Sequence, residues 1–106
     1  MFDAHEVSLD LVRSLRRPVA ILQVRDRDLA QQIRRAASSI PLNLGEGRRR
    51  SGKDRLQHWR IAAGSAEEVR AALRVALAWG DVREGDAVQA LDLVDRVLAM
   101  LWRMTH

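Results

Sequence analysis

The stretch RIAAGSAEEVRAALRVALAWG, residues 60–80, decides the fold class, because its apolar and small residues recur with the period of an α-helix. The spacing alternates between four and three, which gathers one stripe on a single helix face: Ala62, Ala66, Val69, Leu73, Ala76 and Gly80. A second stripe lies beside the first: Ile61, Ser65, Ala72, Val75 and Trp79. Two apolar faces predict either a helix covered on both sides by its own bundle or, as we favour, a helix that also packs against a neighbouring subunit.

Local signals mark both ends of this helix, which we expect at about 52–79. Ser51, with Asp54 three residues later, forms the S-x-x-D pattern that satisfies free amides at a helix start. Gly80 stands where a residue in the left-handed conformation closes a helix.

Upstream of this helix the helical period continues, and two prolines interrupt it. A first helix is expected at about 3–23, kinked or broken by Pro18, because proline removes an amide donor and crowds the preceding turn. A second helix carries apolar residues from Leu29 to Ile40 and meets Pro41.

Downstream, the apolar stripes predict a last helix at about 86–104, with Asp86 as its N-cap. No stretch alternates with period two for long enough to predict a strand. Four helices with short links favour an all-α, up-down-up-down four-helix bundle, formed by residues 1–106 as a single domain.

The composition excludes several classes of site. The 106 residues contain no cysteine, which excludes a disulfide framework, a thiolate zinc site and a cysteine nucleophile. The three histidines lack metal-ligand spacing and no nucleophile–base–orienter set is present, so we expect no metal, no cofactor and no enzymatic activity. No apolar run approaches the roughly 20 residues that span a bilayer, so we expect no membrane contact and a cytoplasmic location.

One motif imitates a phosphate-binding loop. In GRRRSGKD, residues 47–54, Gly47 is followed after four residues by Gly52-Lys53. A phosphate loop needs Ser or Thr after the lysine and a strand before the glycine, whereas here Asp54 follows and the preceding pattern is helical. We therefore interpret this segment as a joint in which Gly47 ends one helix and Ser51 begins the next.

The charge is concentrated around that joint. Thirteen basic and four acidic side chains lie between residues 13 and 60, a net charge of +9, although the whole chain carries only +4. Seventeen of the eighteen cationic residues are arginines, which either suit an anionic partner or reflect a GC-rich genome. The residues that we expect to bind nucleic-acid phosphates are Arg34, Arg35, Arg48, Arg49, Arg50, Lys53 and Arg55.

Three segments in this order resemble a known family. QIRRAASSIPLNLGEG (32–47), then a basic link with Ser51, then RIAAGSAEEVRAAL (60–73) and AWG (78–80) are similar to the bacterial four-helix bundle proteins, also called 23S ribosomal RNA intervening-sequence proteins. The similarity covers nearly the whole chain. The family motif is filled here by Arg34, Arg35, Ser39, Pro41, Asn43, Glu46, Gly47, Arg60, Gly64, Ser65 and Glu68. This chain departs from the family at Gly45, where alanine is usual, and at Pro18.

The resemblance implies a bundle that assembles as a homopentamer, without known enzymatic activity and with a proposed role in RNA or DNA binding. A related group, the accessory proteins of diversity-generating retroelements, works with a reverse transcriptase. We therefore expect a non-catalytic oligomeric bundle that binds nucleic acid, RNA foremost, through the basic joint. The alternative is a protein-protein assembly or adaptor module, whose arginines pair with carboxylates of another subunit, of a reverse transcriptase or of another protein partner.

Overall fold

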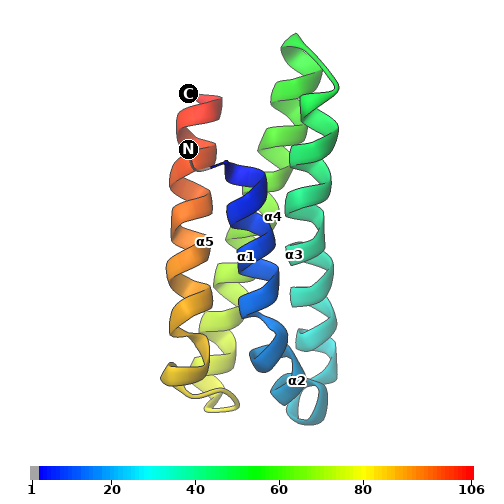
Figure 1. The fold of residues 1–106 in the computed structure, drawn as a ribbon. Coiled ribbons are helices and arrows are strands. Elements are labelled where there is room, and N and C mark those ends of the chain that lie inside the picture. Colours follow the sequence, from blue (N-terminus) through cyan, green and yellow to red (C-terminus); the bar gives the residue numbers. More distant parts are fainter. Residues whose placement is uncertain (1–2) are drawn as a thin grey trace.

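Five α-helices account for most of residues 3–106, the part of the chain that the computed structural model describes (Figure 1). They are α1 (Ala4–Ser14), α2 (Arg16–Arg25), α3 (Arg27–Arg48), α4 (Gly52–Trp79) and α5 (Glu84–Thr105). Within the described residues there is no strand, which confirms the all-α prediction. In Figure 1, α1 and α2 run in the same direction one after the other, and α3, α4 and α5 then alternate. The prediction of four helices was one helix short, because the first predicted helix is two.

The break between α1 and α2 follows from Pro18. A proline at this position has no amide to donate to the Ser14 carbonyl, and its ring crowds that carbonyl, so α1 ends at Ser14. The Leu15 amide instead donates to the Leu11 and Val12 carbonyls, both at 3.1 Å, and the buried Leu15 side chain anchors the break in the core. The predicted kink or break is therefore confirmed as a break, three residues before the proline.

Pro41 has no such effect on α3. We expected the second helix to meet Pro41, but α3 continues through this residue to Arg48, one residue beyond the expected end at Gly47. The Pro41 side chain is buried, as are Ile40 and Leu44 on either side of it. Packing of this segment outweighs the one hydrogen bond that proline removes from the helix.

The ends of α4 match the predicted signals, whereas the start of α5 does not. Ser51 occupies the N-cap position of α4, although its side chain makes no capping hydrogen bond, and Gly80 closes the helix with a φ of 77°. Asp86 is not an N-cap, because α5 already begins at Glu84. Its carboxylate instead accepts a hydrogen bond of 2.6 Å from Nε of Arg17, a residue of α2.

Apolar side chains from all five helices form one buried cluster. The first stripe predicted for α4 lies in this cluster, from Ala62 to Ala76. The second stripe is only partly covered: Ala72 is buried, whereas Ile61, Val75 and Trp79 are exposed. The chain alone therefore covers one apolar face of α4 and leaves much of the other open. No helix among residues 3–106 combines the length and the hydropathy that a membrane span requires.

Candidate nucleic-acid interface

The helix α3 passes into α4 through a link of three residues at one end of the bundle (Figure 1). We call residues 46–55, which include this link, the basic joint. Five of the seven residues predicted to bind nucleic acid lie in it: Arg48, Arg49, Arg50, Lys53 and Arg55. Arg34 and Arg35 do not, because α3 continues through Pro41 and places them about 20 Å along the helix from Arg48. Both are exposed, but they form a separate cationic position on α3.

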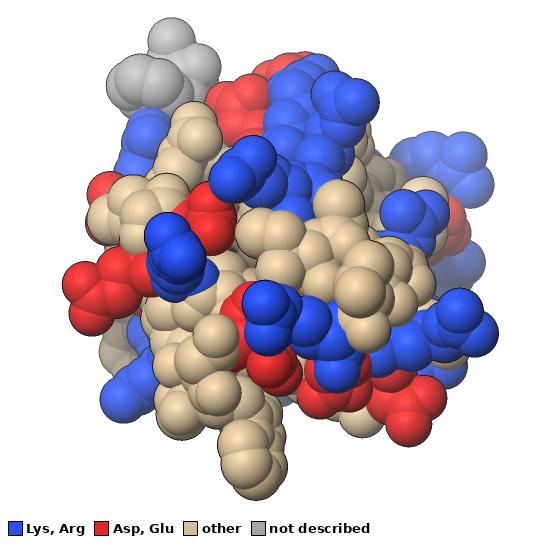
Figure 2. Space-filling model, turned by 90° about the horizontal axis from the view of Figure 1, so that it is seen from below, with Lys and Arg blue, Asp and Glu red and all other residues tan. Residues whose placement is uncertain are grey.

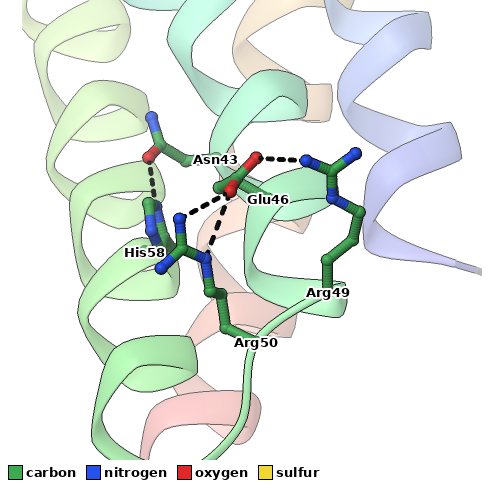
Figure 3. A network of polar contacts seen from close by, with 5 residues as sticks. All are labelled: Asn43, Glu46, Arg49, Arg50 and His58. Carbon is green, nitrogen blue, oxygen red and sulfur yellow. Dashed lines mark hydrogen bonds and ion pairs between the residues drawn. The ribbon is translucent and has the colours of Figure 1, made fainter.

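One carboxylate of the joint is shared by two arginines (Figure 3). Glu46 Oε1 accepts hydrogen bonds from Nε and a terminal nitrogen of Arg50, at 3.2 and 3.0 Å, and its Oε2 lies 3.4 Å from Arg49. The hydrogen bond from Arg50 and the charge of Arg49 hold the pKa of Glu46 below its usual value. The Arg49 side chain nevertheless remains 78% exposed. The third arginine, Arg48, forms an ion pair with Asp3 near the start of α1.

Arg55 stabilises the basic joint through contacts within the chain. Its guanidinium donates to the Gly47 and Arg48 carbonyls, at 3.0 and 3.3 Å, and so ties the start of α4 to the end of α3, where the Gly47 carbonyl also accepts from the Arg50 amide. The same guanidinium lies 5.6 Å from the ring centre of Trp59, within the range of a cation–π interaction. Arg55 is therefore engaged within the chain on two sides, in contrast to Lys53, which is exposed.

Gly47 allows a close approach between α3 and the Trp59 side chain of α4 at the joint. A Cβ atom at this position would lie 2.6 Å from Nε1 and 2.8 Å from Cδ1 of the Trp59 indole. The indole therefore packs directly against the backbone of α3, and its Nε1 is buried without a hydrogen-bond acceptor. Glycine is required here for space, since its φ is not positive.

A chain of polar contacts below the joint holds α3 to α4. The Ser65 hydroxyl on α4 donates to the Ser39 hydroxyl on α3 at 2.9 Å. Nδ2 of Asn43 donates to the carbonyl and the hydroxyl of Ser39, both at 3.0 Å. Oδ1 of Asn43 then lies 3.0 Å from Nδ1 of His58, back on α4 (Figure 3). Ser39, Asn43 and Ser65 therefore act in helix packing, which the sequence pattern alone did not show.

The sequence did not indicate that His58 belongs to this network. Its signal in the sequence is weak, because a single histidine on a helix identifies no partner. Ser39 and Asn43, by contrast, stand four residues apart, the spacing at which side chains on one helix meet. This spacing could have identified half of the network.

Three further positions of the family motif, Arg60, Gly64 and Glu68, lie on the exposed face of α4. A Cβ atom at Gly64 would meet nothing within 4 Å. The packing of the single chain therefore does not require a glycine there, unlike at Gly47. Ser51 is exposed as well, and Pro41 is buried.

The opposite end of the bundle, which carries the α2–α3 and α4–α5 turns, has a different surface (Figure 2). Basic and acidic side chains interleave there, with uncharged surface between them. The Arg17–Asp86 pair between α2 and α5 belongs to this end. Blue surface is continuous at the top of this view, so this end also presents cations; the basic joint is the candidate interface because five of the seven predicted residues lie in it.

The comparisons with known proteins agree with the predicted family. The profile of the 23S rRNA-intervening sequence proteins matches residues 3–103. The chain belongs to this family. A solved structure from Bacteroides thetaiotaomicron VPI-5482, described as a protein with unknown function from the S23 ribosomal protein family, superposes with a TM-score of 0.84. It is 18% identical, over 97% of this chain and 98% of that one, so the likeness concerns the fold. No curated protein matches the chain in sequence.

Proposed function

We propose that this member of the 23S rRNA-intervening sequence family is a non-catalytic bundle that binds the phosphate backbone of nucleic acid at the basic joint. The observation that carries the proposal is the start of α4, where the Ser51 side chain makes no capping hydrogen bond. The first amides of a helix have no partner within it, and they attract anions. Arg49, Arg50 and Lys53 stand exposed around this helix start.

The charge balance at the joint supports this binding. Residues 46–55 hold five cationic side chains and two carboxylates, Glu46 and Asp54, and Asp3 adds a third from α1. The ion pairs of the joint join side chains that are largely exposed, and such pairs are weak enough to be exchanged for phosphates. The description of the family, 23S rRNA-intervening sequence protein, favours RNA as the partner. Contacts of this kind carry no sequence discrimination, and their affinity falls steeply as salt increases.

The test compares two triple variants that remove equal charge. Arg48, Arg49 and Arg50 are replaced by Ala in the joint variant, and Arg25, Arg74 and Arg83, three exposed arginines outside the joint, in the control. Fluorescence anisotropy with a labelled RNA at 50 to 200 mM salt measures both affinity and salt dependence. We expect the joint variant to bind at least tenfold more weakly, with a slope of log affinity against log salt smaller by about 2 to 3. Equal losses in the two variants would place the binding outside the joint.

The exposed stripe of α4 favours a second function, assembly with further copies of the chain. Ile61, Val75 and Trp79 are 41%, 45% and 74% exposed on one side of this helix. Exposed apolar side chains along one side of a helix are typical of subunit contacts. A homopentamer is the assembly expected for this family, and light scattering coupled to size exclusion measures the subunit number. Val75→Glu should lower that number and leave the helix content unchanged; an unaltered number would remove this face from any subunit contact.

A further inference from the structure

A tryptophan stands exposed close to the end of α5 that lies on the same side of the bundle as the basic joint. The Trp102 side chain is 61% exposed, and the red end of α5 and the green joint share the upper end of Figure 1. One side of the indole is stacked on the His106 ring, with 3.4 Å between the ring centres and 20° between the planes. The stack orders the indole and leaves its other face to solvent.

The register of α4 against α5 places an arginine near the level of this tryptophan along the bundle. Arg70 of α4 contacts Asp95 of α5 at 3.0 Å, which fixes where the two antiparallel helices meet, and it contacts Glu67 of its own helix at 2.8 Å. Seven residues are two helical turns and about 10 Å, and they return to the same helix face. Seven residues beyond Asp95 is Trp102, and seven before Glu67 is Arg60. Both steps lead from this ion pair toward the basic joint.

The same helix face leads onward to the joint. Lys53 stands seven residues before Arg60, again on the same face of α4 and about 10 Å further along it. Arg60, Lys53 and Arg103, the neighbour of Trp102, are all exposed, and none of them forms an ion pair within residues 3–106. Cations without a partner in the chain therefore connect the basic joint with an exposed aromatic ring.

We propose that Trp102 stacks on a nucleobase while Lys53 and Arg60 contact the phosphates next to it, so that the preferred ligand is single-stranded RNA. The inference rests on the proposed function and adds the form of the nucleic acid. Aromatic rings accept any base by stacking, and cations beside them follow the backbone. A duplex keeps its base faces inside the helix, so it reaches the cations of the joint but not the indole.

A second exposed tryptophan provides a matched control. Trp79 is 74% exposed at the far end of α4, next to the turn that leads to α5. It resembles Trp102 in exposure and in its place near a helix end. It differs in lying at the end of the bundle where acidic and basic side chains interleave (Figure 2).

The experiment measures affinity for a labelled 12-nucleotide single-stranded RNA and for the same sequence as a duplex, by anisotropy in 50 mM salt. Trp102→Ala should weaken single-strand binding about tenfold, the size expected for one lost base stack, and leave duplex binding unchanged. Trp102→Phe should recover most of the single-strand affinity, because an aromatic ring is restored. Trp79→Ala should keep the parent's ratio of single-strand to duplex affinity, because any change that it makes in the subunit number affects the binding of both RNAs together.

Three outcomes would overturn the inference. Trp102→Ala binds the single strand like the parent, or it loses affinity for the duplex by the same factor, or light scattering shows that it changes the subunit number. The first two would leave RNA binding at the joint intact, and the third would assign Trp102 to a subunit contact. If the parent binds neither RNA in 50 mM salt, the proposed function itself is wrong.

Discussion

Replacing Gly47 by alanine tests the close contact between α3 and the Trp59 indole of α4. The added methyl group would lie 2.6 Å from Nε1 and 2.8 Å from Cδ1 of Trp59, both well inside van der Waals contact. The atoms belong to a rigid ring rather than to the flexible end of a side chain, so the indole as a whole must move. Moving it also disturbs the position that Arg55 takes over the ring.

Two opposing effects set the size of the change. Inserting a methyl group into a packed contact typically costs about 1–3 kcal/mol. Alanine in place of glycine inside a helix stabilises the folded chain by about 0.5–1 kcal/mol, because the unfolded chain has less conformational entropy to lose. The net expectation for Gly47→Ala is a loss of up to about 2.5 kcal/mol in the free energy of unfolding, measured by urea denaturation followed by circular dichroism.

Two further variants separate packing from helix propensity. Gly64→Ala, where a Cβ atom meets nothing within 4 Å, should stabilise the chain by about 0.5–1 kcal/mol. In a Trp59→Ala background, Gly47→Ala should no longer destabilise, because the atoms that it meets are gone. A Gly47→Ala protein as stable as Gly64→Ala would refute the reasoning, since it would show that the indole gives way without cost.

Two other predictions concern the polar contacts near the joint. Asn43→Ala should lower the free energy of unfolding in urea by about 1–2 kcal/mol, because it removes contacts to Ser39 and His58. Ser38→Ala, on the exposed side of α3, should leave that free energy almost unchanged. Equal effects of the two substitutions would argue against the network. Glu46 has a folded pKa below its usual 4.5, so its pairs stabilise the chain above that pH and are lost as the pH falls through the folded value. Thermal melts between pH 7 and pH 3 should therefore show a larger loss for the parent than for Glu46→Gln; identical pH profiles would contradict this.

Local signals in the sequence located the ends of α4. Ser51 and Gly80 act through their own backbone conformation, so no knowledge of the rest of the fold is needed to place them. The break at Pro18 is local for the same reason. The profile match confirms the family that the motif predicted, and the similar solved structure confirms the helical fold.

The wrong predictions concern features that depend on contacts between residues distant in sequence. Asp86 carries the signal of an N-cap, but Arg17, 69 residues away in sequence, holds its carboxylate instead. Pro41, by contrast, lies buried inside α3 without ending it, in line with the end expected at Gly47. This continuation also explains why Arg34 does not join the basic joint, because an unbroken helix separates it from Arg48 by about 20 Å.

The carboxylate of Glu46 has two guanidinium partners, of which Arg50 is the closer and Arg49 the more exposed. A phosphate that recruits Arg49 would leave Glu46 tied to Arg50 and the α3–α4 link unchanged. Arg49 would then contact the ligand, while Arg50 would keep its ion pair with Glu46 and hold the link in place. On this geometry, the proposed binding of a phosphate at the folded joint requires no rearrangement of the backbone.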